Sequence, residues 1–111
     1  MTRGEIWWVD FGVPQGSEVG FQRPVIILQN NVLNASKLKT VIVLPLTTNM
    51  MYADIPNNIV LEKKITGLAK TSVTQPHLIV HVDKSRLYKR VTKLDTDILE
   101  KVFNGVVESM S

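Results

Sequence analysis

Polar side chains stand at the points where short apolar runs of this sequence end. The clearest case is Arg23, which lies between a glycine-containing stretch and the apolar residues 25–28. Pro24 fixes its own φ and favours extended geometry in the residue before it, so we expect Arg23 to project from a defined backbone. The other polar residues with this placement are Thr47, Thr48, Asn49, Gln75 and His77.

These residue types fit the cleavage of RNA without a metal ion. The 2′-hydroxyl of RNA is its own nucleophile, so a protein needs only to supply proton transfer, positioning and stabilisation of charge on the phosphate. The guanidinium of Arg23 can bind two phosphate oxygens at once, and the Thr47 hydroxyl can donate a further hydrogen bond. Histidine is the side chain most often used for proton transfer near neutral pH, so His77 is the predicted base or acid, with Gln75 orienting the phosphate or a base.

Each of these residues also has an ordinary structural role open to it. Arg23 could instead pair with a carboxylate such as Glu18 or Asp10, and Thr47 could cap the end of its strand. His77 could be a surface residue that only contacts RNA. The sequence leaves these alternatives open.

Composition and motifs exclude several other chemistries. The 111 residues include no cysteine, so disulfides and thiolate metal sites cannot form. His77 and His81 lack the acidic or imidazole neighbours of a zinc site, and no nucleotide-binding glycine motif or Gly-x-Ser-x-Gly sequence occurs. We therefore expect no metal and no other cofactor. No apolar run approaches the roughly 18 residues of a membrane span, and no targeting segment is visible, so we expect a cytoplasmic protein.

The basic residues are concentrated near the C-terminal end. The formal net charge is only +3, but residues 84–93 hold five basic side chains and no acidic one. Such a run creates a local field that attracts phosphates, although it is also typical of a solvated strand and its turn. The five basic residues are Lys84, Arg86, Lys89, Arg90 and Lys93.

The hydrophobic pattern predicts a single domain over residues 1–111. Its class is mainly β (α+β), a small and strongly bent antiparallel barrel with a C-terminal helix. Pro76 cannot donate to a ladder, so the strand that contains it must lie at an edge or be bulged there. The predicted strands cover residues 3–10, 24–29, 40–46, 57–61, 70–82 and 90–94, and the helix starts at Asp95 or Thr96. Its predicted apolar stripe consists of Ile98, Leu99, Val102, Phe103 and Val106.

Four stretches of the sequence carry a family resemblance. They are RGEIWWVD at residues 3–10, GSE at 16–18 leading to RPVIILQN at 23–30, VIVLPLTT at 41–48, and VDKSRL at 82–87. In this order and spacing they resemble the MazF/PemK (Kid) family of toxin endoribonucleases from bacterial toxin–antitoxin systems. The resemblance covers essentially the whole chain.

The resemblance implies an SH3-like barrel that cuts single-stranded RNA at short sequences, without metal, and leaves a cyclic phosphate. It places Arg23 and Thr47 at the family's catalytic positions, and residues 13–22 at a loop that closes near RNA. The expected catalytic residues are therefore Arg23, Thr47 and His77. The residues expected to bind the substrate are Glu18, Gln22, Thr48, Asn49, Gln75, Lys84 and Arg86. Family members often carry arginine or an acidic residue where this chain has Gln75, His77 and Val80, so the base and acid are left open.

The resemblance also implies partners. We expect a homodimer, with apolar area from residues 47–56 or from the C-terminal helix, and a cognate antitoxin. A short acidic segment of the antitoxin would bind the basic face near Arg23, Lys84 and Arg86 and compete with RNA. The alternative function is that of a non-catalytic toxin with the same fold, which binds a protein target such as DNA gyrase.

Overall fold

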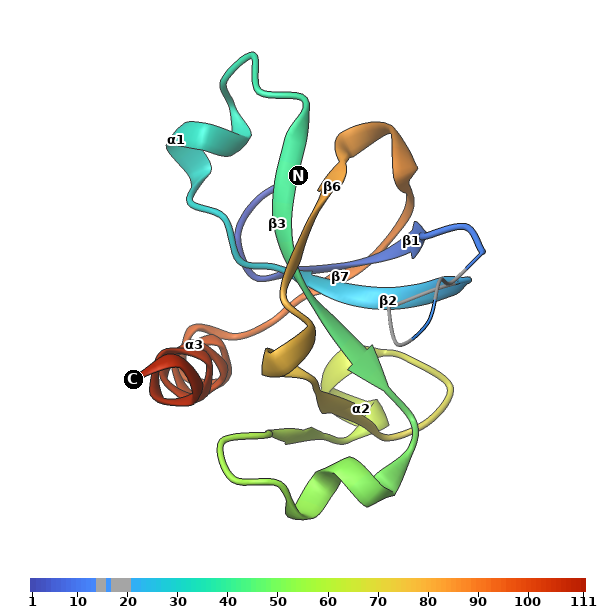
Figure 1. Ribbon diagram of the computed structural model, residues 1–111, viewed down its shortest axis with the longest axis vertical. Helices are drawn as coiled ribbons and strands as arrows, with labels where there is room; N and C mark the ends of the chain where they lie inside the picture. Colours follow the sequence, from blue (N-terminus) through green and yellow to red (C-terminus); the bar gives the residue numbers. More distant parts are fainter. Residues whose placement is uncertain (14–15, 17–20) are drawn as a thin grey trace.

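The computed structural model describes residues 1–13, 16 and 21–111. Within these residues, seven strands form one bent antiparallel sheet with the order β4-β5-β3-β2-β1-β7, and β6 pairs with β3 (Figure 1). The strands are β1 (Glu5–Asp10), β2 (Gln22–Ile27), β3 (Thr40–Thr47), β4 (Val60–Leu61), β5 (Ser72–Thr74), β6 (Val80–Asp83) and β7 (Leu87–Lys93). The predicted fold class is confirmed, since the C-terminal helix α3 (Thr96–Met110) lies against this sheet.

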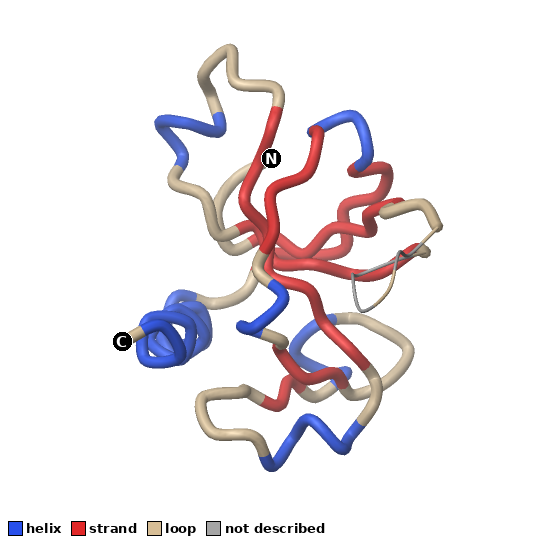
Figure 2. The backbone as a smooth tube through the Cα atoms, viewed as in Figure 1, coloured by secondary structure: helices blue, strands red, loops and turns tan. Residues whose placement is uncertain are grey.

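Strand β3 organises the sheet because it is long enough to pair with three others. Its middle pairs with β2, where Val43 lies opposite Ile27. Its first half pairs with β6 on the other side, and its last two residues pair with β5. The end of β3 therefore lies between β2 and β5 in the sheet. Figure 2 shows β3 as the long red strand that runs from the upper part of the molecule down to the short strands below.

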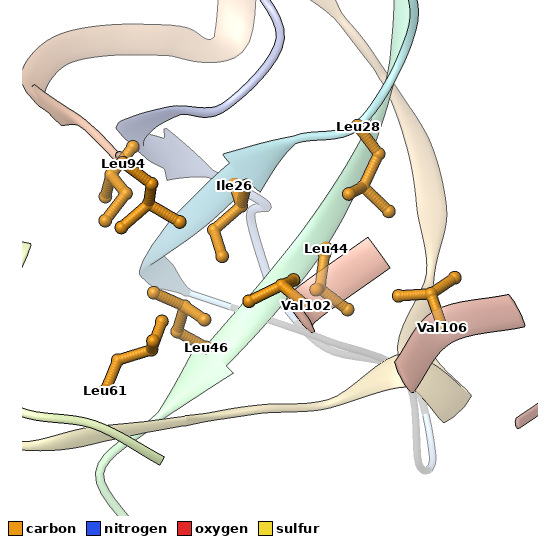
Figure 3. Packing of buried hydrophobic residues seen from close by; sticks show 9 residues of the cluster. Ile26, Leu28, Leu44, Leu46, Leu61, Leu94, Val102 and Val106 are labelled. Atoms are coloured by element: carbon orange, nitrogen blue, oxygen red, sulfur yellow. The ribbon is translucent and has the colours of Figure 1, made fainter. Parts of the chain in front are cut away.

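Both faces of the sheet are covered by apolar side chains. On one face, Ile26 lies between Ile6 and Leu44, and this cluster packs against Val102 and Val106 of α3 (Figure 3). The other face carries a second cluster of Val9, Val25, Ile27, Val41, Val43, Val82 and Leu87. Strand β1 contributes to both clusters and lies in the sheet between β2 and β7.

The helix α3 buries most of its predicted stripe. Val102 and Val106 are buried, and Ile98 and Leu99 pack against the first cluster. Phe103 is an exception, with 37% of its surface exposed. The Arg3 guanidinium lies 4.2 Å from the centre of its ring, so this aromatic makes a cation–π contact rather than joining the core.

Helix α3 also approaches the loop before β4 very closely at Gly105. A Cβ atom at this position would lie 2.5 Å from the carbonyl oxygen of Asn57. Asn57 itself has a φ of 73°, which few residues other than glycine and asparagine adopt readily. The absence of a side chain at Gly105 is therefore what allows helix and loop to touch.

Three predicted strands differ substantially from the structure, whereas the bounds of the other three differ by one or two residues. The predicted strand 70–82 is wrong, because it divides into β5, a 3₁₀ turn (Pro76–Leu78) and β6. Pro76 has no N–H to give, and the N–H of Leu78 instead donates to the carbonyl of Gln75, which closes the turn. The predicted strand 57–61 shrinks to β4, and 90–94 belongs to the longer β7.

The remaining helical segments are short. They are α1 (Asn31–Asn34), α2 (Lys63–Thr66) and the 3₁₀ turns Met50–Asp54 and Lys84–Arg86. Among the described residues no helix has both the length and the apolar character needed to cross a membrane.

Candidate functional site

The ends of β2 and β3 bring Arg23 and Thr47 to one hollow. Arg23 lies opposite Val9 near the start of β2, and Thr47 is the last residue of β3. Both side chains are half-buried. They line a hollow of about 260 Å³, which we call the Arg23 hollow, and its other walls are Trp8, Gln22, Pro24, Leu46 and Thr48. The structure thus gathers four predicted site residues: Gln22, Arg23, Thr47 and Thr48.

Gln75 holds the guanidinium of Arg23. Its side chain is buried, and its backbone N–H donates to the carbonyl of Pro45 on β3. The Arg23 Nη1 donates to the Gln75 Oε1 at 3.2 Å. Because a guanidinium can only donate, the amide oxygen must be the atom that faces it. A neutral acceptor therefore orients Arg23 without cancelling its charge.

The alternative pairing of Arg23 with Asp10 is not found. The Asp10 carboxylate instead accepts from the backbone N–H of Gly12 at 2.9 Å. In the residues with a described position, no carboxylate oxygen lies within 4 Å of the Arg23 guanidinium. The predicted substrate contact Glu18 lies outside the described residues.

The Thr47 hydroxyl has a defined direction. Its Oγ1 accepts from the backbone N–H of Asn49 at 3.1 Å, so the hydroxyl proton is free to donate elsewhere. Asn49 in turn caps the 3₁₀ turn that follows, since its Oδ1 accepts from the N–H of Met51 at 3.0 Å. The local hydrogen bonds of residues 47–51 thus fix the oxygen of Thr47 at the edge of the hollow.

His77 lies in a different place from the one expected for it. His77 does not follow Gln75 along a strand, because a 3₁₀ turn replaces the predicted strand at Pro76. The exposed imidazole stacks on Tyr52, with ring centres 5.6 Å apart and planes at 12°. It lines a separate hollow of about 630 Å³ that also includes Phe11, Val80 and Arg86.

Three members of the basic run have separate hydrogen-bond partners. The Lys84 Nζ donates to the carbonyl of Asn34 at 2.9 Å, and the Arg86 Nη1 to that of Asp10 at 3.1 Å. Arg90 is paired with a carboxylate. The charge of Arg90 is therefore paired within the fold, whereas the neutral acceptors leave Lys84 and Arg86 charged.

Among the basic residues at 84–93, Arg86 is the one whose hollow shares a wall residue with the Arg23 hollow. It lines a hollow of about 330 Å³ together with Gln22, which is also a wall of the Arg23 hollow. The Gln22 Oε1 accepts from the Tyr88 hydroxyl at 3.1 Å, which joins β2 to β7 there. Sequence reasoning did not assign Tyr88 any role.

Sequence reasoning also missed the ion pair between Glu5 and Arg90. The Arg90 Nε lies 2.5 Å from Oε2 of the buried Glu5 carboxylate, whose Oε1 accepts from Thr2 N and Trp7 Nε1. Burial raises the pKa of Glu5, but hydrogen bonds from Arg90, Thr2 and Trp7 lower it by more than burial raises it. The resulting pKa is about 2. The pair joins residues 85 positions apart, which no local pattern signals.

Comparison with known proteins agrees with this architecture. Residues 2–110 match the model of the PemK-like, MazF-like toxins of type II toxin–antitoxin systems. The chain belongs to this family. Curated relatives include endoribonuclease MazF6 of Mycobacterium tuberculosis (strain H37Rv) and endoribonuclease MazF2 of Mycobacterium bovis. Each is 36% identical over 106 residues, which cover 96% of this chain and 93% of the relative.

Solved structures of similar fold include an endoribonuclease and a MazF protein. An endoribonuclease from a mycobacterial species, solved with its cognate antitoxin, has a TM-score of 0.80 at 18% identity and covers 99% of this chain and 94% of its own. MazF of Deinococcus radiodurans has a TM-score of 0.80 at 20% identity, covering 99% and 96%. These structures show the same fold, and the match of residues 2–110 to the family model confirms the family predicted from the four sequence stretches.

Proposed function

We propose that this toxin is an endoribonuclease that cleaves single-stranded RNA at short sequences without a metal ion. The observation that carries the proposal is the pairing of Arg23 with a neutral amide beside a directed Thr47 hydroxyl. A cation that is held in place yet keeps its charge suits the stabilisation of a phosphate that gains negative charge. The endoribonuclease relatives support the same reaction.

In this proposal the 2′-oxygen of one nucleotide attacks its own 3′-phosphorus. The bond from phosphorus to the 5′-oxygen of the next nucleotide breaks, which leaves a 2′,3′-cyclic phosphate and a free 5′-hydroxyl. Arg23 and Thr47 bind the non-bridging oxygens as charge builds on them. The proton of the 2′-hydroxyl leaves to a base, and the 5′-oxygen receives one from an acid. His77 lies in another hollow of this chain, and its part in proton transfer stays a prediction.

The same hollow would bind the RNA near the scissile phosphate. Gln22 and Thr48 line it and offer an amide and a hydroxyl to the sugar or base edges. Glu18, Lys84 and Arg86 are proposed to contact RNA further along, together with Asn49. Of these, Arg86 is supported by the wall that its own hollow shares with Gln22.

We also propose that the toxin acts as a homodimer in the cytoplasm and binds a cognate antitoxin. The exposed apolar side chains on the 3₁₀ turn Met50–Asp54 and on α3 are the surfaces from which we expect apolar area for a dimer interface. They are Met50, Met51, Val107 and Met110. Sedimentation at micromolar concentration should give a dimer, and a monomer would contradict this part of the proposal.

Incubation of the purified toxin with a long RNA in excess EDTA tests the function directly. We expect internal cuts at a recurring short sequence, with cyclic phosphate at the new 3′ ends. A matched sample of Arg23→Ala should leave the RNA intact. Intact RNA in the wild-type sample, with inhibition of gyrase supercoiling, would instead support the non-catalytic alternative.

A further inference from the structure

The adjacent residues Trp7 and Trp8 have different surroundings. Trp7 packs against the second apolar cluster, and its Nε1 donates to the Glu5 Oε1 at 3.2 Å. Trp8 lies on the opposite face, across from Pro24. It is also half-buried, but its Nε1 has no hydrogen-bond partner among the described residues. One indole is thus built into the structure, and the other reaches solvent.

Trp8 stands between two neighbouring hollows. It lines the Arg23 hollow, and with Pro24 and Thr48 it also lines a second hollow of about 270 Å³. The other walls of this second hollow, which we call the Trp8 hollow, are Leu68, Ala69, Lys70 and Ser72. Because three walls are shared, a strand whose phosphate lies at Arg23 can continue directly into it.

The walls of the Trp8 hollow suit a flat group with an apolar face and a polar edge. The indole, Pro24 and Leu68 offer hydrocarbon, whereas the buried Ser72 hydroxyl is polar. Lys70 is exposed at the rim, and its ammonium makes no ion pair within the described part of the chain. The volume lies below the roughly 300–1,000 Å³ of pockets for larger ligands.

We propose that the Trp8 hollow binds one base of the RNA strand, next to the scissile phosphate. The base stacks on Trp8, and Lys70 binds the phosphate that follows it. Stacking on an aromatic ring is a common way to hold single-stranded RNA, and the unpaired indole N–H adds a donor for a base edge or sugar. This inference rests on the proposed function, since it needs RNA at Arg23.

A double-mutant cycle, which combines a change in the RNA with a change in the protein, tests the contact. The cleavage-inactive Thr47→Ala toxin is titrated with oligonucleotides that span a mapped cleavage site, each lacking one base. We expect loss of one flanking base to weaken binding about 5- to 100-fold. Trp8→Ala in the same background should weaken the intact oligonucleotide similarly, and removal of that base should then have no further effect. Trp8→Phe should retain most of the affinity.

Variants at exposed positions test the hollow even if Trp8→Ala impairs folding. Ala69→Phe should fill the hollow and weaken binding as Trp8→Ala does, while Ala35→Phe, on an exposed position after α1, should not. Lys70→Ala should make the affinity for RNA less dependent on salt concentration, by the amount expected for the loss of about one phosphate contact. Lys64→Ala is its control, because Lys64 is paired with Glu62 at 3.3 Å.

The outcomes separate this inference from the proposed function. If the wild-type toxin cuts RNA but Trp8→Ala and Ala69→Phe bind every oligonucleotide as the parent does, the stacking site is overturned and the hollow is left for a protein segment. If the fold-changes in affinity caused by Trp8→Ala and by base removal simply multiply at every base position of the oligonucleotide, no base contacts Trp8. If wild-type toxin cuts no RNA, it is the proposed function that fails.

Discussion

Two arginines of this toxin, Arg23 and Arg90, show opposite uses of the same side chain. Arg90 donates to the buried Glu5 carboxylate at 2.5 Å and links β7 to β1. Arg23 donates to the neutral amide of Gln75 at 3.2 Å and links β2 to the segment after β5. Both are oriented by one acceptor, but only the acceptor of Arg90 carries a charge. An arginine paired with carboxylate serves the fold, whereas one paired with an amide keeps its charge for a ligand.

Exchange of each arginine for alanine should separate these roles most strongly. Arg23→Ala should lower the cleavage rate by about 10²- to 10³-fold, because it removes a donor to the charged transition state. Thermal unfolding should change little, since Arg23 lies at a strand end. Arg90→Ala should do the reverse, with lower stability but a near-normal single-turnover rate per folded molecule. Wild-type cleavage by Arg23→Ala would contradict the mechanism.

A carboxylate at position 75 would turn the Arg23 site into a copy of the Arg90 pair. Gln75→Glu should lower the single-turnover rate about tenfold or more at pH 7, because the new charge offsets the guanidinium. Gln75→Met removes the acceptor but adds no charge, so it should lower the rate less. Equal rates for the two variants, measured at saturating RNA, would show that Gln75 acts through packing alone.

The stability of the Glu5 pair should depend on pH in a defined direction. The pKa of Glu5 falls from 4.5 to about 2 on folding, so the pair stabilises the protein above pH 4.5 and loses its effect as pH falls toward 2. Glu5→Gln should lower the free energy of unfolding by about 1–3 kcal/mol at pH 7. Urea unfolding at several pH values should show the two proteins converging in acid, and a constant gap would argue against the pair.

The smallest effect should come from His77, whose imidazole stacks on Tyr52 away from Arg23. We expect His77→Gln to lower the cleavage rate by less than Arg23→Ala does. The pH dependence of the rate decides its role. An inflection within about a unit of 6.5 that disappears in the variant would assign proton transfer to His77. An inflection that persists would leave it as a contact residue.

The sequence predicted the fold class and the position of Arg23 and Thr47 because these depend on local patterns. Apolar runs mark strands, and both residues stand where such runs end. The sequence could not predict which residues are partners across the sheet, because Arg23 and Gln75 are 52 residues apart. Gln75 was expected to face RNA. The path after Gln75 was also missed, because Pro76 is compatible with a bulged edge strand and with the 3₁₀ turn that forms.

The basic run teaches a related point. Its charges are close in sequence, but they lie on a 3₁₀ turn and on β7, where alternate residues point to opposite faces. Lys89 lies across from Trp8, and Arg90 from Trp7. Only the three-dimensional register decides which charges share a surface.

The contact at Gly105 links the C-terminal helix, which contributes no side chain to the Arg23 hollow, to the loop before β4. Any side chain there must displace the Asn57 carbonyl or tilt α3. Asn57 follows the turn that Asn49 caps, and Asn49 also binds the Thr47 oxygen. We therefore expect Gly105→Ala to destabilise the toxin although Arg23 and Thr47 are unchanged, so that a culture carrying this variant is poisoned less at high temperature than at low temperature.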